Sequence, residues 1–214
     1  MEFLPQPIED YAEQHTTPHS KLLDELFYYT VTHVHTPRMI SGKLQGRWLS
    51  MVSHWVRPKR VLEIGTYTGY SALCLAEGLA PNGELHTIDI NPQMQKVQKQ
   101  FIGKSQYANQ IHLHCGNALD LIPQMEPNWD LVFIDADKEN YAQYYQMLLP
   151  SLPSGAVIIA DNVLWSGKVL NESERQEDSS AQALHLFNDM VQKDPSVCNM
   201  LLPIRDGLMI VRKL

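Results

Sequence analysis

The stretch RVLEIGTYTGYS, residues 60–71, decides the fold of this chain. Its first half is a short apolar run typical of a buried strand, and Gly65 ends that run. Gly69 follows four residues later, and a helical pattern begins at Ser71. A strand that turns through glycines into a helix brings backbone N–H groups close to a ligand. The spacing Gly-x-x-x-Gly lacks the glycine that admits a pyrophosphate in dinucleotide sites. We therefore expect a nucleotide-like ligand without phosphates, for which S-adenosylmethionine (SAM) is the leading candidate.

Two acids near this turn favour a cofactor site over a plain tight βα turn. Asp89 ends the next predicted strand, 20 residues after Gly69, where a second βα unit places a carboxylate on ribose hydroxyls. Glu63 lies inside a predicted buried strand and therefore needs a hydrogen-bonding partner. Taken singly, Asp89 could be a solvated acid at a helix start, and Glu63 could make a structural hydrogen bond. In combination with the glycine turn, both acids favour SAM.

The composition is that of an ordinary globular protein. The chain has 214 residues, of which 44% are hydrophobic and 19% charged, as expected for one α/β domain. A net charge of −7 argues mildly against nucleic acid as a partner, although a local basic patch stays open. Cys74, Cys115 and Cys198 are odd in number and lie in apolar patterns, so we expect buried, reduced thiols. We see no long apolar run and no signal peptide, and predict a cytoplasmic protein that does not contact membranes.

From residue 60 onward, strand, turn and helix alternate. This alternation predicts an α/β fold with a doubly wound, mostly parallel seven-stranded sheet. The short turn at 205–207 predicts that the last two strands form an antiparallel hairpin. Residues 1–58 are helical in character, and we interpret them as a lid and dimer surface on the core, 59–214, of a single domain, 1–214. The predicted strands are 60–64, 84–89, 111–115, 131–135, 156–160, 197–203 and 208–212, and the predicted helices are 71–79, 92–106, 119–125, 141–149 and 179–193.

Polar side chains also follow two later strands of the predicted sheet. One apolar run ends on Asp135, and another ends on Asp161 and Asn162. Because ligands bind at the carboxyl ends of parallel strands, we expect these three residues to converge beside the nucleotide site. Two carboxylates and an amide oxygen suit Mg²⁺, with Mn²⁺ or Ca²⁺ as alternatives, and no His or Cys joins them at zinc spacing. The competing interpretation is that such acids cap the next helix or turn.

Lys138 is the candidate general base. It follows Asp135 by three residues, where a bound cation would favour the neutral amine and lower its pKa. The alternative is a surface lysine paired with Asp137 or Glu139. Trp165, which follows the candidate metal ligands, could form an apolar wall for an aromatic substrate.

Five ordered segments together resemble the cation-dependent O-methyltransferases, the family of caffeoyl-CoA and catechol O-methyltransferases. They are VLEIGTYTGYSAL, TIDINP, FIDADKENY, ADNVLWSGKV and LPIRDGLMIVRK. The resemblance covers residues 36–214. It implies a Rossmann-like fold, SAM as methyl donor, a divalent metal that holds two vicinal hydroxyls of the acceptor, and a homodimer.

The resemblance also implies roles for individual residues. It matches Asp135, Asp161 and Asn162 to metal ligands and Lys138 to the catalytic lysine. The predicted substrate-side residues are Trp165 and Asp206. The predicted SAM contacts are Ser41, Glu63, Gly65, Thr66, Tyr67, Ser71, Asp89, Ala118 and Asp135. The chain departs from the plant enzymes at 42–45, where Gly-Lys-Leu-Gln replaces acidic residues, and this affects the pocket for the acceptor.

We therefore predict metal-dependent methyl transfer from SAM to a hydroxyl of a catechol-like small molecule, of which caffeoyl-CoA is one example. One alternative acceptor is a hydroxylated uridine in tRNA, and another reading is a non-catalytic SAM-binding module. A nicotinamide dehydrogenase is less favoured because the glycine spacing is wrong. A basic face near the pocket would favour tRNA, and its candidate residues are Lys21, Arg38, Lys43, Arg47 and Lys168.

Overall fold

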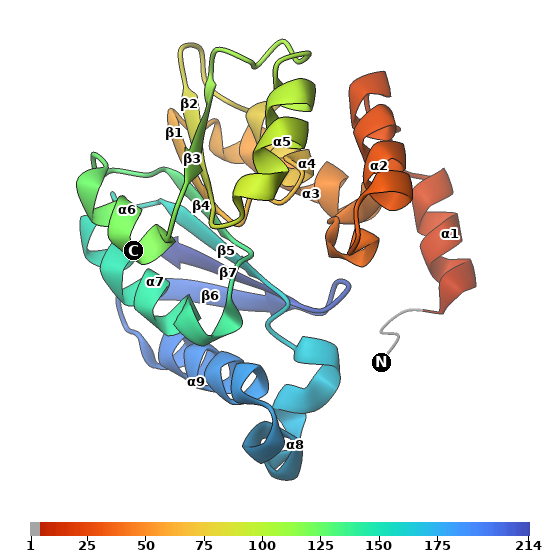
Figure 1. Ribbon diagram of the computed structural model, residues 1–214. Coiled ribbons are helices and arrows are strands. Elements are labelled where there is room, and N and C mark those ends of the chain that lie inside the picture. Colours follow the sequence, from red (N-terminus) through yellow and green to blue (C-terminus); the bar gives the residue numbers. More distant parts are fainter. Residues whose placement is uncertain (1–4) are drawn as a thin grey trace. The chain divides into compact units, whose positions relative to one another are not determined.

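The computed structural model describes residues 5–214 (Figure 1). The chain forms two compact units, here called the N-terminal unit, Gln6–Met125, and the C-terminal unit, Glu126–Leu214. Across the described residues, no helix combines the length and the apolar character that a membrane-spanning helix needs.

The N-terminal unit begins with helices, as the sequence predicts for this region. They are α1 (Gln6–Gln14), α2 (Lys21–His33), the short 3₁₀ helix η1 (Pro37–Met39) and α3 (Gly42–Val56). Ser20 starts α2, because its hydroxyl accepts a hydrogen bond from the backbone N–H of Leu23. The helix α2 buries Leu23, Leu26 and Thr30, and both α2 and α3 pack against α4 (Tyr70–Ala76).

The sheet strands of this unit are parallel and lie in the order β3-β2-β1. They are β1 (Arg60–Ile64), β2 (Glu84–Asp89) and β3 (Ile111–Cys115), as predicted. The connections contain α4, η2 (Pro92–Met94), α5 (Gln95–Ile102), α6 (Ala118–Leu121) and η3 (Ile122–Gln124). The predicted helices 92–106 and 119–125 each divide into an α-helix and a 3₁₀ turn. Pro92 and Pro123 lie in those turns, because proline lacks the N–H that a helix interior needs.

The C-terminal unit has the strand order β4-β5-β7-β6. Its strands are β4 (Leu131–Ile134), β5 (Val157–Asp161), β6 (Val197–Leu202) and β7 (Leu208–Lys213). β4 and β5 are parallel, whereas β7 is antiparallel to both β5 and β6, so the predicted hairpin is confirmed. Gly207 in its turn has φ +87°, and a Cβ there would lie 2.5 Å from Leu164 Cγ, which only glycine avoids.

Helices cover this half of the sheet. They are η4 (Lys138–Asn140), α7 (Tyr141–Leu148), η5 (Leu149–Ser151), η6 (Trp165–Leu170), α8 (Glu172–Glu177) and α9 (Ser179–Lys193). In Figure 1, α9 runs beside β6, and it packs against α7 as well. Asp178 starts α9 by accepting hydrogen bonds from the N–H groups of Ser180 and Ala181.

The cysteines differ from the expectation of buried thiols. Cys74 is fully buried in α4, but Cys115 and Cys198 are exposed, and all three are free. Cys115 is the last residue of β3 and Cys198 lies on β6, and each of these strands stands at the end of its unit's strand order. An apolar pattern therefore did not guarantee burial, because a terminal strand is covered on fewer sides than a central one.

Candidate functional site

The turn between β1 and α4 has an unusual backbone. Gly65, Tyr67 and Gly69 have φ values of +104°, +49° and +93°, so three of five consecutive residues lie in the left-handed region. The N–H of Gly65 donates to the carbonyl of Ile88, 2.9 Å away on β2, and Gly69 N donates to Thr66 O at 2.8 Å. The two glycines thus fix a tight path from the strand into the helix.

Asp89 at the end of β2 holds this turn in place. Its Oδ2 accepts a hydrogen bond of 2.6 Å from the backbone N–H of Tyr67, and its Oδ1 accepts one of 2.8 Å from Asn91 N. Burial raises the pKa of Asp89, although the two N–H groups act in the opposite direction. A carboxylate has about four lone-pair sites, so Asp89 keeps acceptor capacity for the hydroxyls of a ligand.

Glu63 lies fully buried in β1, and its partner is a side chain of β2. Thr87 Oγ1 donates to Glu63 Oε2 at 2.5 Å, and the hydroxyl of Thr66 lies 2.5 Å from that of Thr87. This chain of hydrogen bonds supports the alternative in which Glu63 has a structural role. Its contact with SAM stays a prediction.

Three further predicted SAM contacts are buried residues at helix starts in the same unit. Ser41 immediately precedes α3, Ser71 lies in the first turn of α4, and Ala118 is the first residue of α6. A helix start offers backbone N–H groups that no residue of the helix satisfies. The structure thus gives the N-terminal unit several donors of the kind that a nucleoside requires.

The candidate metal ligands meet at the ends of two paired strands in the C-terminal unit. β4 and β5 pair in parallel through Ile134↔Ala160, and each of these residues is followed directly by one of the acids, Asp135 and Asp161. The expected convergence of the two acids therefore follows from the register of the strands. Asn162 comes next, in the left-handed region with φ +62°, and its N–H donates to Asp161 Oδ1 at 2.7 Å.

A tyrosine and a lysine connect these two strand ends. Lys138 Nζ donates to Asp135 Oδ1 at 2.9 Å and to the hydroxyl of Tyr141 at 2.7 Å. The Tyr141 hydroxyl oxygen in turn lies 3.0 Å from the carbonyl oxygen of Asp161 and 3.2 Å from that of Ile134. Sequence reasoning missed this role of Tyr141. Its spacing of three residues from Lys138 at a helix start was the available signal.

Lys138 is not the surface lysine of the alternative interpretation, because only 9% of it is exposed. Burial alone lowers the pKa of Lys138, but Tyr141 and the carboxylates of Asp135 and Asp161 outweigh that effect, and the pKa is raised. The lowered pKa expected from the sequence depends on a bound cation that would neutralise these carboxylates, so it stays a prediction for the metal-bound state.

The chemistry of the oxygen donors in this cluster fits a hard divalent cation. Asp135, Asp161 and Asn162 offer two carboxylates and an amide oxygen, which is the ligand type that Mg²⁺ and Ca²⁺ prefer. Asp161 is only 4% exposed, and a buried carboxylate needs compensating charge or hydrogen bonds. Lys138 supplies one positive charge, which balances one of the two carboxylates. The charge of the second carboxylate could be balanced by a bound cation.

Trp165 and Asp206, the predicted substrate-side residues, lie in two segments that contact each other, the start of η6 and the turn between β6 and β7. The backbone N–H of Leu164 donates to Asp206 O at 2.9 Å, and Asp206 Oδ1 accepts from the N–H of Ser166. Trp165 Nε1 donates to Asp178 Oδ2 at 3.1 Å, so the indole is anchored to the start of α9. Burial raises the pKa of Asp206.

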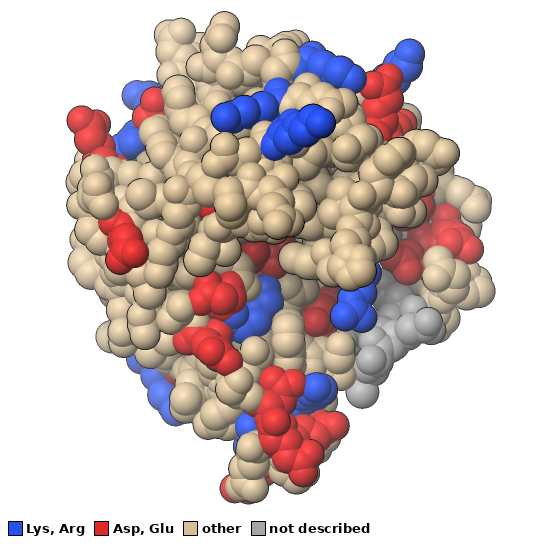
Figure 2. Space-filling view, in the orientation of Figure 1, with Lys and Arg blue, Asp and Glu red and all other residues tan. Residues whose placement is uncertain are grey.

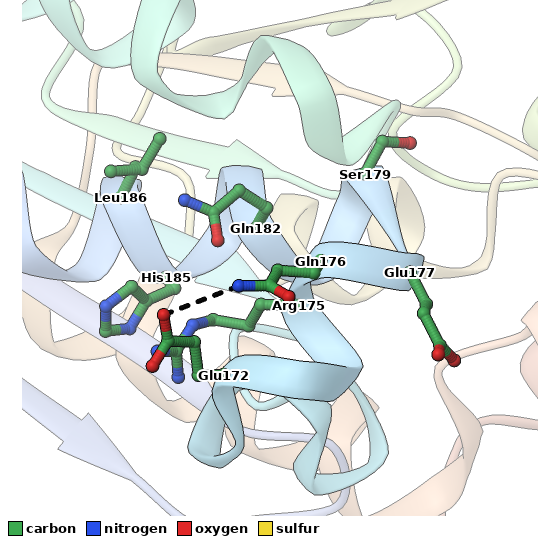
Figure 3. Close-up of a pocket in the computed structure, with 8 residues that line it drawn as sticks. All are labelled: Glu172, Arg175, Gln176, Glu177, Ser179, Gln182, His185 and Leu186. Atoms are coloured by element: carbon green, nitrogen blue, oxygen red, sulfur yellow. Dashed lines mark hydrogen bonds between the residues drawn. The ribbon is translucent and has the colours of Figure 1, made fainter.

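A separate hollow lies between α8 and α9 (Figure 3). Its volume is about 690 Å³, and on its α8 side Gln176 Nε2 donates to Glu172 Oε1 of the same helix at 3.4 Å. It contains none of the predicted site residues, so we do not assign the chemistry to it. The lining residues are Glu172, Arg175, Gln176, Glu177, Ser179, Gln182, His185 and Leu186.

The sequence profile described as O-methyltransferase matches residues 13–214, nearly the whole chain. The chain belongs to this O-methyltransferase family. The resemblance drawn from the five sequence segments is thereby confirmed, as is the expected enzyme class, a SAM-dependent O-methyltransferase.

Individual relatives of this O-methyltransferase agree with that assignment. Catechol O-methyltransferase of Niastella koreensis is 34% identical over 157 residues, which cover 72% of this chain and 70% of the relative. Caffeoyl-CoA O-methyltransferase 2 of Eucalyptus globulus is 32% identical over 185 residues, which cover 82% and 75% of the two chains.

Solved structures show the same fold. The methyltransferase of Podospora anserina, bound to S-adenosylhomocysteine (SAH), superposes with a TM-score of 0.90 at 29% identity and covers 99% of this chain and 98% of its own. The O-methyltransferase of Bacillus cereus, also in complex with SAH, has a TM-score of 0.87 at 27% identity, with 97% of both chains covered. The predicted class is confirmed: a Rossmann-like fold with seven strands, mostly parallel, and a C-terminal antiparallel hairpin.

Proposed function

We propose that this O-methyltransferase transfers the methyl group of SAM to a hydroxyl of a catechol-like small molecule and needs a divalent cation, with Mg²⁺ favoured. The observation that carries the proposal is the cluster of buried Lys138, Tyr141 and Asp161 with the partly exposed Asp135 at two adjacent strand ends. The relatives named catechol and caffeoyl-CoA O-methyltransferase support the choice of acceptor.

The SAM site is proposed on the N-terminal unit, along the β1–α4 turn. There, Asp89 accepts two backbone hydrogen bonds and can still accept from the two ribose hydroxyls. Gly65, in the left-handed region, carries no Cβ and admits the close approach of a ligand. A Cβ on Gly69 would instead lie 3.3 Å from Ile102 Cδ1, so that glycine serves the packing of the turn. The SAH-bound structures of the Podospora and Bacillus enzymes support this choice of cofactor.

The metal site is proposed on Asp135, Asp161 and Asn162. A divalent cation held by these oxygens would acidify an acceptor hydroxyl and, by neutralising the two carboxylates, favour the neutral amine of Lys138. A hard oxygen set without His or Cys favours Mg²⁺ over Zn²⁺.

Lys138 is proposed to accept the proton of the acceptor hydroxyl at Nζ. Asp135 and Tyr141 hold that nitrogen in one position, so its approach to the hydroxyl does not depend on a flexible side chain. Methyl transfer from a sulfonium requires an oxygen nucleophile in line with the departing sulfur. Fixed groups that orient the acceptor supply a large share of the rate enhancement.

A small acceptor is favoured over tRNA because part of the candidate basic face is already neutralised. Arg47 Nη1 lies 3.0 Å from Glu77 Oε2, and Lys168 Nζ lies 2.7 Å from Asp178 Oδ2. On the face shown in Figure 2, Lys and Arg side chains are scattered among acidic ones and form no continuous basic surface. Binding to RNA phosphates relies on a connected basic surface.

The experiment that tests the acceptor is a direct competition. Purified enzyme is incubated with SAM, Mg²⁺ and an equimolar mixture of catechol, caffeoyl-CoA and tRNA that carries 5-hydroxyuridine, and the methylated products are measured by mass spectrometry. We expect monomethylated catechol or caffeoyl-CoA. Methylation of the tRNA without any product from the two small acceptors would establish the alternative instead.

A further inference from the structure

A cluster of histidines lies on β2 and β3, outside every site described above. His86 pairs with His112 in the parallel register of the two strands. Glu84 stands two residues before His86, and His114 stands two residues after His112. Because strand side chains alternate between faces, these four side chains project from the same face of the two strands.

Three of these side chains bring their ligand atoms together. His86 Nε2 lies 3.3 Å from Glu84 Oε1, and His112 Nε2 lies 3.8 Å from Glu84 Oε2. One ligand atom from each of the three residues lies within 4.8 Å of the other two. Tetrahedral coordination with bonds of about 2.0–2.1 Å needs ligand atoms about 3.3–3.4 Å apart, so small side-chain shifts would close the site.

The remaining histidine fixes the orientation of His86. His114 Nε2 lies 3.0 Å from His86 Nδ1, and the two rings stack with their centroids 5.2 Å apart. A histidine that binds a metal through one ring nitrogen usually donates a hydrogen bond from the other, which sets its tautomer and ring orientation. In this arrangement His86 directs Nε2 toward Glu84 and His112.

Glu84 also pairs with an arginine. Arg60 Nε donates to Glu84 Oε1 at 2.8 Å, so the arginine and a metal would share this carboxylate. A carboxylate can accept both, because its two oxygens offer about four lone-pair sites.

We propose that Glu84, His86 and His112 bind a transition-metal ion such as Zn²⁺, with His114 as the positioning residue for His86. Two imidazoles and one carboxylate suit Zn²⁺ and disfavour Mg²⁺, which distinguishes this site from the oxygen ligands at the ends of β4 and β5. The bound ion would connect β2 to β3, the last strand of its unit's order.

The test is isothermal titration of Zn²⁺ into the full chain without a polyhistidine tag, with millimolar Mg²⁺ present to occupy hard-oxygen sites. We expect one Zn²⁺ per chain. Both His112→Ala and His114→Ala should weaken binding at least about tenfold, because outer-shell partners alone contribute about 10–100-fold. His54→Ala, which removes an exposed histidine of α3, is the matched control and should leave binding unchanged.

The His112 side chain is 44% exposed, so its removal should leave the fold intact, as circular dichroism in EDTA would verify. If His112→Ala does not fold, His112→Gln and the rise of the thermal midpoint of the wild-type chain on adding Zn²⁺ replace it. The proposal is overturned by the absence of Zn²⁺ binding at micromolar concentration. It is also overturned by equal binding to the wild-type chain and the His112 variant, which would place the ion elsewhere.

Discussion

Lys138 Nζ lies 2.7 Å from the hydroxyl oxygen of Tyr141, and both side chains are buried. Burial raises the pKa of Tyr141, so the phenol stays neutral and acts as a fixed polar partner of the amine. Because Tyr141 also reaches the backbone at the ends of β4 and β5, the position of the amine is tied to the strand ends that carry Asp135 and Asp161. This arrangement has consequences that can be measured.

The first consequence concerns Lys138 as the base. Lys138→Ala should lower kcat by about 10²–10⁴-fold, the usual contribution of a general base. The affinity for SAM should be retained, because the proposed SAM contacts lie mainly in the N-terminal unit. Steady-state kinetics and SAM titration calorimetry would measure both, with Lys193→Ala, an exposed lysine of α9, as control. An unchanged kcat would refute the assignment.

Asp89 should matter for cofactor binding. Asp89→Ala removes an acceptor for the ribose and also leaves the N–H groups of Tyr67 and Asn91 without their partner. We expect SAM binding to weaken by about 1–3 kcal/mol, the usual cost of stranding polar partners. Calorimetry should show no such loss for Asp189→Ala, in which an exposed acid of α9 is removed. Equal affinities of the two variants would contradict the proposed ribose contact.

His19 should make stability depend on pH. Burial, followed by the charge of Arg47, lowers the pKa of His19 from 6.5, and its Nδ1 hydrogen-bonds with the hydroxyl of Tyr70. Below pH 6.5 the unfolded chain therefore binds a proton that the folded chain does not, so the free energy of unfolding should fall as the pH falls from about 6.5 toward 5. Urea unfolding at several pH values would measure this slope.

In His19→Gln the slope should be smaller, because glutamine does not titrate. His86 and His114 also have lowered pKa values and should account for part of the slope that remains. If the slopes of the wild type and the variant are identical, His19 does not have the lowered pKa that this prediction assumes.

The N-terminal helices should form the interface of a homodimer. They expose large apolar side chains, for example Tyr28 at 70% and Trp55 at 67%, more than a helix that only covers a core requires. Light scattering at micromolar concentration should give the mass of a dimer for the wild-type chain. Trp55→Glu should shift the mass toward a monomer, whereas Leu186→Glu on α9 should not. A wild-type monomer would refute this prediction.

The sequence predicted the strands well because their signals are local. The apolar run before Gly65 and the acids at the ends of β2, β4 and β5 mark strand ends without knowledge of the tertiary structure. α8, Glu172–Glu177, was missed because it buries no residue and so has no periodic pattern. The formation of such a helix depends on contacts with neighbouring elements and is not signalled by its own sequence.

The site was harder to predict where it depends on distant residues. The raised pKa of Lys138 reflects Tyr141 and Asp135 first, and also Asp161, 23 residues later in the chain. The partner of Glu63 is Thr87 on the next strand. The histidine cluster requires the register of β2 and β3, which no local pattern specifies. The spacing of residues along the sequence identified the acids of the site. The charged and polar groups around those acids could be identified only from the structure.

The most direct test of the central claim is the cation dependence of methyl transfer. Enzyme stripped with EDTA and then dialysed would be assayed with SAM and catechol before and after addition of Mg²⁺, in the wild type and in Asp161→Ala. We predict no turnover by the stripped wild type, recovery on addition of Mg²⁺, and no recovery in Asp161→Ala. Full turnover by the stripped wild type, or by Asp161→Ala, would contradict the proposed metal site.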